Sequence, residues 1–275
     1  MAHRNRYNCL IKIDSDHYMD LRTGEVKEYN HGSSRASNIA TVRKSLESLR
    51  DLLNTNVIDT RFCRWITLTY AENMTDTKRL YEDWTNFIKR LRYRYGHFEY
   101  IVAMEPQGRG SWHAHVVAIF PHIAPYIPND VLRDIWGYGF VTVKRIDEVD
   151  NVGVYLTAYL GDMELTEALS AGLSLPDRLD IKEVDLLDDE GQALTKKYVK
   201  GARLSMYPPG FNLYRFSRGV KKPEITYMTQ KSAKEKVSAA TLTFRSAVRI
   251  TDEESGYQNI IQHEYYNMNP RERNK

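Results

Sequence analysis

Two histidines separated by one residue are the first side chains whose spacing suggests chemistry. His113 and His115 lie in the segment 112–120, whose aromatic and β-branched residues favour a strand. Side chains at positions i and i+2 of a strand project from the same face, so both imidazoles point to one side. Two imidazoles on one face can chelate a divalent cation. Taken alone, such a pair is more often part of a strand that binds no metal.

A carboxylate from the preceding predicted strand adds a third candidate ligand. Glu105 ends the segment 98–105, and the Gly-rich turn 107–110 leads from there to the histidines. We expect the two strands to pair as a hairpin and to bring this carboxylate beside the imidazoles. One carboxylate and two imidazoles leave coordination positions open, as a catalytic metal requires. Mixed nitrogen and oxygen ligands suit Mn²⁺ or Mg²⁺ on a phosphate substrate, and they can also take Zn²⁺.

Two tyrosines supply a candidate nucleophile. Tyr155 and Tyr159 are four residues apart in the segment 151–160, which we predict to be helical, so both phenols lie on one helix face. A free phenol has a pKa near ~10 and attacks phosphorus well only when the cost of its ionisation is lowered. A metal that polarises the scissile phosphate reduces that cost. With 19 tyrosines in the chain, the pair taken alone is better explained as two half-buried aromatics covering a sheet.

The elements that must position these residues alternate across residues 62–160. Their predicted order is strand, helix, strand, strand, helix, strand, helix. The predicted strands are 62–70, 98–105, 112–120 and 140–146, and the predicted helices begin at Thr75 or Asp76, at Pro128 and at Asn151. This alternation predicts an α+β fold in which helices pack on a mostly antiparallel sheet.

Composition divides the chain into four predicted segments. Residues 1–60 form an N-terminal extension with a hairpin and an amphipathic helix that Asn38 or Ser37 caps, and residues 61–160 form the core. Residues 161–200 are an acidic, partly helical insertion. Residues 201–275 are a basic, β-rich region that packs on the core.

The whole composition bounds the class of protein. The net charge of +3 hides an acidic stretch between Asp162 and Glu190, so the rest of the chain is more basic and can accept a polyanionic partner. Cys9 and Cys63 show no metal-ligand spacing, which favours a reducing, cytoplasmic setting. We find no signal-peptide core, no run long enough for a membrane span and no phosphate-binding loop of the ATPase type.

The ordered set of motifs resembles a known superfamily. The strand 66–70 (Ile-Thr-Leu-Thr-Tyr), the His-x-His strand after a Gly-Arg-Gly turn and the Tyr-x-x-x-Tyr helix occur in this order with compact spacing. This combination resembles the HUH endonuclease superfamily, specifically the rolling-circle replication initiators of phages and small plasmids. The likeness covers residues 62–160, and the stretches 202–210 and 214–223 resemble the distal part of such initiators.

The resemblance implies a fold, an activity and site residues. The fold is RRM-like or ferredoxin-like, with a central antiparallel sheet of about five strands, packing helices and terminal extensions. The activity is metal-dependent nicking of single-stranded or hairpin origin DNA of a plasmid, phage or mobile element, through a 5′-phosphotyrosine that frees a 3′-OH for a host polymerase. Glu105, His113 and His115 match the metal site, Tyr159 the usual nucleophile and Tyr155 the second tyrosine. A phosphotyrosine ester preserves the bond energy, so rejoining needs no ATP, and a host helicase or supercoiling must open the duplex.

One departure from the family pattern concerns a lysine that members commonly carry in the tyrosine helix. Ala158 and Asp162-Met163 occupy its usual places, and Lys196, Lys197, Lys200 or Arg203 are the candidates to replace it. Basic side chains with interleaved aromatics suit DNA contact, although solvation of a helix end explains those at 89–94 equally well. The candidate DNA-binding residues are Arg109, Lys89, Arg90, Arg92, Arg94, Arg203, Arg215, Arg218, Lys221 and Lys222.

Three alternatives remain from the residues alone. A relaxase or a single-strand transposase shares the chemistry, but relaxases usually carry a histidine triad and an N-terminal tyrosine, and the transposases are usually shorter with one tyrosine. A non-catalytic RRM-like nucleic-acid-binding module leaves Glu105 and the histidine pair unexplained. A zinc hydrolase that activates water would not need Tyr155 or Tyr159.

Overall fold

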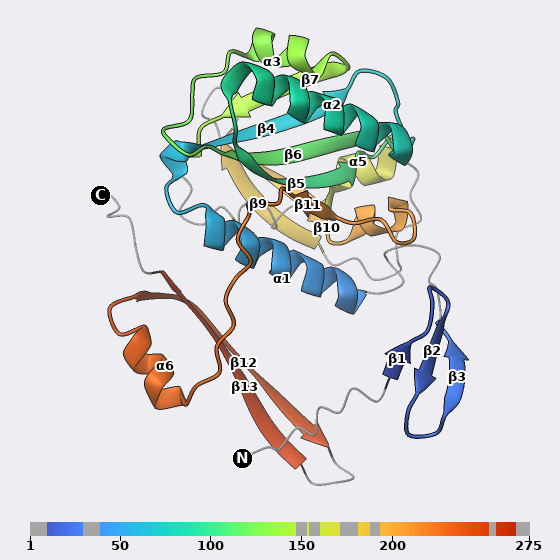
Figure 1. The fold of residues 1–275 in the computed structure, drawn as a ribbon, viewed down its shortest axis with the longest axis vertical. Coiled ribbons are helices and arrows are strands. Elements are labelled where there is room, and N and C mark those ends of the chain that lie inside the picture. Colours follow the sequence, from blue (N-terminus) through green and yellow to red (C-terminus); the bar gives the residue numbers. More distant parts are fainter. Residues whose placement is uncertain are drawn as a thin grey trace.

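A five-stranded antiparallel sheet forms the centre of the computed structural model, which describes residues 10–29, 39–146, 153, 160–170, 181–187, 193–252 and 257–267 (Figure 1). The strand order is β11-β5-β6-β4-β7. The strands are β4 (Cys63–Tyr70), β5 (Glu99–Pro106), β6 (Trp112–Ile119), β7 (Gly139–Lys144) and β11 (Tyr214–Phe216). All four pairings between them are antiparallel. The predicted α+β fold with a sheet of about five strands is confirmed.

Helices cover both faces of this sheet (Figure 1). On one face lie α2 (Thr77–Tyr95) and α3 (Asn129–Trp136), and Phe87 of α2 shares a buried cluster with Ile66 and Val116 of the sheet. On the other face lies α1 (Ile39–Asn56), whose Leu49 packs with Val117 in a second buried cluster. The alternation of side chains along β6 therefore assigns Val116 to the α2 face and Val117 to the α1 face.

The ends of α2 and α3 follow local sequence signals. The side chain of Asp76 accepts hydrogen bonds from the backbone N–H groups of Lys78 and Arg79, so Asp76 and not Thr75 caps α2. Helix α3 ends at Gly137, which adopts a left-handed conformation with φ of 78°. The predicted cap of α1 at Asn38 or Ser37 lies outside the described residues.

The hairpin β5–β6 sets the register of the candidate ligands. In this hairpin Glu105 is the direct partner of His113, and Ala103 is the partner of His115. Strand β4 pairs with the other edge of β6, where Thr67 is the partner of His115. The predicted pairing of the two strands is confirmed, and it brings the carboxylate and both imidazoles to the α1 face of the sheet.

Smaller elements lie around the main sheet. The N-terminal strands β1 (Leu10–Lys12), β2 (His17–Asp20) and β3 (Glu25–Glu28) form one antiparallel sheet, with the predicted turn at Thr23-Gly24 between β2 and β3. The strands β12 (Thr241–Asp252) and β13 (Tyr257–Asn267) form a hairpin preceded by α6 (Gln230–Lys236). Arg50 of α1 contacts this hairpin, because its Nη2 donates to the Tyr265 hydroxyl at 2.6 Å.

The acidic segment 161–200 contains more strand than its composition suggests. Its described part holds one short helix, α5 (Leu165–Ser170), as the predicted partly helical character requires. It also holds β8 (Met163–Glu164), β9 (Ile181–Leu187) and β10 (Ala193–Val199), which form a sheet in the order β8-β10-β9. An ion pair across β9 and β10, between Lys197 and Glu183 at 3.1 Å, matches the charges of the two strands.

Among the described helices, none combines the length and apolar composition that spanning a membrane requires.

Candidate metal centre

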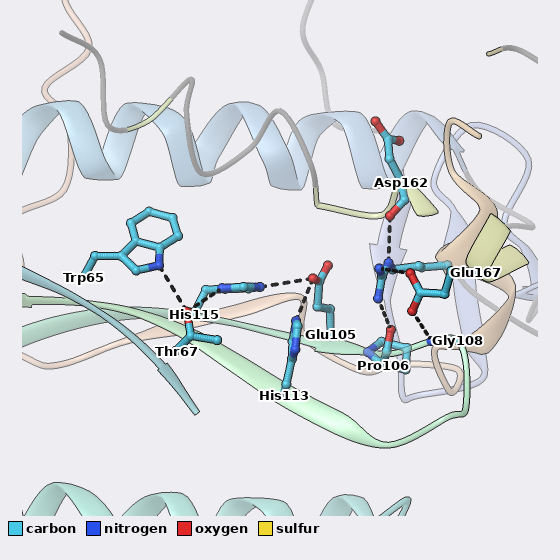
Figure 2. A network of polar contacts seen from close by, with 10 residues as sticks. Trp65, Thr67, Glu105, Pro106, Gly108, His113, His115, Asp162 and Glu167 are labelled. Atoms are coloured by element: carbon cyan, nitrogen blue, oxygen red, sulfur yellow. Dashed lines mark hydrogen bonds and ion pairs between the residues drawn. The ribbon is translucent and has the colours of Figure 1, made fainter. Parts of the chain in front are cut away.

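Glu105 forms the centre of a three-residue cluster on the α1 face of the sheet (Figure 2). Its Oε1 lies 2.9 Å from His113 Nε2 and 3.1 Å from His115 Nε2. One potential ligand atom from each of the three residues lies within 4.8 Å of the other two. The structure thus brings together the three side chains that the sequence selects as metal ligands.

The cluster is buried and polar, a combination that requires compensation. Glu105 is 5% exposed, and both its Oε2 and the Nδ1 of His113 are buried with no hydrogen-bond partner among the described residues. An unsatisfied buried carboxylate oxygen costs about 1–3 kcal/mol or more, because it has lost water without gaining a donor. A divalent cation is a fitting partner for this oxygen and for the two imidazoles, whose donor set is that of an open catalytic site.

The protonation states also favour cation binding. Burial opposes ionisation of Glu105, but hydrogen bonds from His113 and His115 outweigh it and hold the pKa of this carboxyl well below its usual range. Burial lowers the pKa of His113, which keeps its imidazole neutral. An anionic carboxylate and a neutral imidazole are the forms that ligate metals.

Thr67 lies behind His115 as an outer contact. Its Oγ1 is 3.4 Å from His115 Nδ1 and accepts a hydrogen bond of 3.2 Å from Trp65 Nε1 (Figure 2). Contacts of this kind orient a ligating imidazole and fix its tautomer. The sequence places Thr67 and Thr69 on one strand face but assigns no function to Thr67. Its distance from the histidine motif along the chain explains why.

Arg203 ties three parts of the site's rim together (Figure 2). It belongs to the 3-10 helix η3 (Ala202–Met206) and is 9% exposed. Its Nε donates to the Asp162 carbonyl at 2.7 Å, and its Nη1 donates to the Pro106 carbonyl at 2.8 Å. Its Nη2 forms an ion pair of 2.8 Å with Glu167. These bonds join the residue after Glu105 to the segment that follows the predicted tyrosine helix.

Glu167 extends this connection to the Gly-rich turn. While one carboxylate oxygen pairs with Arg203, the other accepts the backbone N–H of Gly108 at 2.6 Å. A Cβ atom on Gly108 would lie 2.6 Å from the Glu167 Cγ, so the approach depends on glycine. Three hydrogen-bonding groups of Arg203 are thus engaged with protein acceptors, and we interpret Arg203 as a brace of the site rather than the substitute for the family lysine.

Residues 63–164 match the model of a family of replication-associated proteins, the ORF2 family. This segment belongs to that family. It contains the strands β4 to β7 and the Glu105–His113–His115 cluster, and we call it the replication-protein domain. Membership in this family gives the domain a part in DNA replication and implies that it binds DNA. No curated protein and no solved structure shows a significant match to the chain.

The predicted nucleophiles of the replication-protein domain, Tyr155 and Tyr159, lie outside the described residues. The nearest described positions after them are Leu160, which is 7% exposed, and Gly161. The carbonyl of Gly161 accepts the backbone N–H of Arg203 at 3.0 Å, and Asp162 Oδ1 accepts that of Gly201 at 2.9 Å.

A different tyrosine lies near the cluster. Tyr207 is 2% exposed, and burial together with the negative charge of Glu105 raises its pKa well above the ordinary value. An ionised phenolate at this position is therefore strongly disfavoured, which makes Tyr207 a poor nucleophile. The sequence did not select Tyr207, and no local pattern marks it, because its burial follows from the packing of 207–213 against Trp112.

The basic candidates on α2 lie on the opposite side of the sheet from the cluster (Figure 1). Arg90 Nη2 donates to the Trp136 carbonyl at 3.1 Å, and Arg92 Nη2 donates to the Phe98 carbonyl at 2.7 Å. Lys89, Arg90 and Arg94 line a cavity between α2 and α3. These contacts give Arg90 and Arg92 a structural function, and DNA binding by this group stays a prediction.

The remaining basic candidates lie near the cluster or at the sheet edge. Arg109 Nη2 donates to the Tyr70 carbonyl at 2.8 Å, which fixes the turn before the histidines. Arg215 belongs to edge strand β11, and Arg218 and Lys222 are exposed in the segment after it. Lys221 is anchored through its backbone, whose N–H donates to Asn56 Oδ1 at 2.8 Å.

Proposed function

We propose that this protein nicks and rejoins one strand of DNA at a specific site through a tyrosine nucleophile and so initiates rolling-circle replication of a plasmid, phage or related mobile element. The observation that carries the proposal is the Glu105–His113–His115 cluster, with its unpartnered buried carboxylate oxygen, inside a replication-protein domain. Burying three such polar side chains together costs free energy unless a ligand compensates them, and a metal ion supplies that compensation.

The three residues would hold one Mn²⁺ or Mg²⁺ ion. When bound, the ion supplies a positive charge that polarises the scissile phosphate. The sheet and the Arg203 brace keep the ligands in place, and α1 covers this face of the sheet, which limits the access of water. Pre-positioned ligands reduce the reorganisation needed during reaction.

Tyr159 is the proposed nucleophile and Tyr155 the second tyrosine. The phenol oxygen forms a bond to phosphorus, the bond from phosphorus to the 3′-oxygen breaks, and the phenolic proton ends on the leaving 3′-hydroxyl. The DNA is then linked through a 5′-phosphotyrosine. Because the new ester retains the energy of the phosphodiester, the reverse reaction rejoins strands without ATP. The free 3′-OH is the primer for a host polymerase, and a host helicase or supercoiling opens the duplex.

A covalent-adduct assay tests this proposal. Single-stranded fragments that tile the replicon encoding the protein are end-labelled, incubated with Mn²⁺ and protein, and separated on a denaturing gel. We expect a retarded adduct for the wild type, its severe loss in His113→Ala and His115→Ala, and its loss in Tyr159→Phe. The matched controls are His122→Ala and Tyr126→Phe, since both residues lie outside the cluster and Tyr126 is 83% exposed.

The same gel separates the competing interpretations. Cleavage without any adduct, unaffected by Tyr155→Phe and Tyr159→Phe, would indicate a hydrolase that activates water. DNA binding with neither cleavage nor adduct would indicate a non-catalytic module. An adduct that persists in Tyr159→Phe and disappears in Tyr155→Phe would exchange the functions of the two tyrosines.

A further inference from the structure

A cavity of about 610 Å³ opens at the β11 edge of the main sheet, between α1 and α2. Its walls come from Ser45 of α1, from α2, from β5 and from residues 212–216. Five of its lining residues are aromatic and one is a cation: Tyr81, Trp84, Tyr100, Tyr214, Phe216 and Arg215. This volume lies within the range of roughly 300–1,000 Å³ that ligand-binding pockets occupy.

Several of these rings are available for stacking. The Arg215 guanidinium lies 3.7 Å from the centre of the Tyr81 ring, and Phe216 is 38% exposed. Phe216 also stacks on Tyr214, with ring centres 6.3 Å apart and planes 22° apart. A large aromatic side chain that stays exposed at the mouth of a cavity commonly marks a binding surface.

The charge of the lining selects the class of ligand. The lining residues include one cation and no carboxylate, so the cavity suits an anionic ligand with a flat, stackable part. Single-stranded nucleic acid meets both requirements, because its bases stack on aromatic rings while arginine contacts the backbone phosphates. The position agrees with this choice: the Leu213 carbonyl accepts the backbone N–H of Met104, the residue beside Glu105.

We propose that this cavity binds a base and the adjoining phosphate of the single-stranded DNA whose cleavage is proposed above. Phe216 and the Tyr81–Arg215 pair are the stacking elements, and Arg215 neutralises phosphate charge. The site lies one strand beyond Glu105, so it holds DNA next to the metal centre and not at it. This inference rests on the proposed function for its ligand, but its test does not depend on cleavage.

Equilibrium binding without metal tests the inference. A fluorescein-labelled thymidine homopolymer is titrated with protein in EDTA, and anisotropy gives Kd. Each stacked base contributes enough that its loss weakens binding about 5- to 150-fold, and we expect a weakening in this range for Phe216→Ala. For Arg215→Ala we expect weaker binding and a salt dependence whose slope is smaller by about 0.7. Tyr126→Ala and Arg133→Ala, exposed residues outside the cavity, are the matched controls.

Cross-linking supplies a second, independent readout. A homopolymer that carries 5-iodouracil is irradiated with the protein, and we expect cross-links at Tyr81, Tyr100, Tyr214 or Phe216. The inference is overturned if Phe216→Ala and Arg215→Ala both bind within twofold of the wild type, or if cross-links form only outside 212–216 and these rings. Wild-type adduct formation with unchanged Phe216→Ala binding refutes this inference alone. Cavity-dependent binding without any adduct refutes the proposed cleavage alone.

Discussion

Replacing Arg203 by methionine removes the cation that joins the carbonyls of Pro106 and Asp162 to Glu167. Each hydrogen bond to a charged donor contributes about 1.5–3 kcal/mol net. The ion pair adds less than the roughly 3–5 kcal/mol of a fully buried pair, since the Glu167 side chain is 34% exposed and is screened by water. Bonds that share one guanidinium are not additive, so we expect a total loss of about 3–5 kcal/mol in the free energy of unfolding.

Urea denaturation followed by tryptophan fluorescence measures this loss. Arg203→Lys keeps the charge but cannot bridge three acceptors, so its stability is expected to lie between those of the wild type and Arg203→Met. The control Arg133→Met replaces an exposed arginine and is expected within about 0.5 kcal/mol of the wild type. The double variant with Glu167→Gln should lose less than the sum of the two single changes. Additive losses, or an Arg203→Met protein as stable as the control, would refute the brace.

Three further predictions concern single side chains. Thr67→Val removes the oxygen beside His115 Nδ1 and is expected to weaken Mn²⁺ binding about 10- to 100-fold by calorimetric titration, whereas the control Thr55→Val, on α1, should bind as the wild type does. Burial raises the pKa of the Cys63 thiol to about 12, so roughly one molecule in 10⁴ is a thiolate at pH 8; in a Cys9→Ser background we expect no reaction with a thiol reagent until urea unfolds the protein, and rapid native-state labelling would contradict the assigned burial. Gly139→Ala places a Cβ 2.4 Å from the Ala71 nitrogen at φ of 155°, and we expect it to lower the melting temperature more than Gly24→Ala, where nothing lies within 4 Å; equal effects would contradict this packing.

The metal cluster could be predicted because strand geometry alone determines most of it. The two-residue period puts His113 and His115 on one face, and a short turn makes pairing with the preceding strand the simplest arrangement. The register that places Glu105 opposite His113 then follows from turn length, and the structure has this register. Aromatic and β-branched residues likewise mark β4, β5 and β6, which are buried on at least one face.

The acidic segment shows where sequence patterns fail. Strands β9 and β10 carry lysine and carboxylate side chains that are ordinarily depleted in strands. Their pairing is favoured by cross-strand charges such as Lys197 and Glu183, an effect that becomes visible only once the register is known. Strand β11 has three residues, too few to produce a recognisable alternation.

The Arg203 brace was beyond sequence reasoning for a different reason. Its acceptor on Pro106 is 97 residues away and its partner Glu167 is 36 residues away, so no local spacing relates them. The sequence selected Arg203 only as a cation that could contact phosphate. The structure gives it three protein acceptors instead.

Mass spectrometry of the protein–DNA adduct tests the central claim most directly. After the reaction with Mn²⁺, nuclease digestion leaves a nucleotide on the protein, and trypsin releases a peptide that contains both Tyr155 and Tyr159. We predict a nucleotide joined through its 5′-phosphate to Tyr159, absent when Mn²⁺ is removed by EDTA. Cut DNA whose 5′-phosphate is free, with no modified tyrosine in the protein at any time of the reaction, would contradict the account.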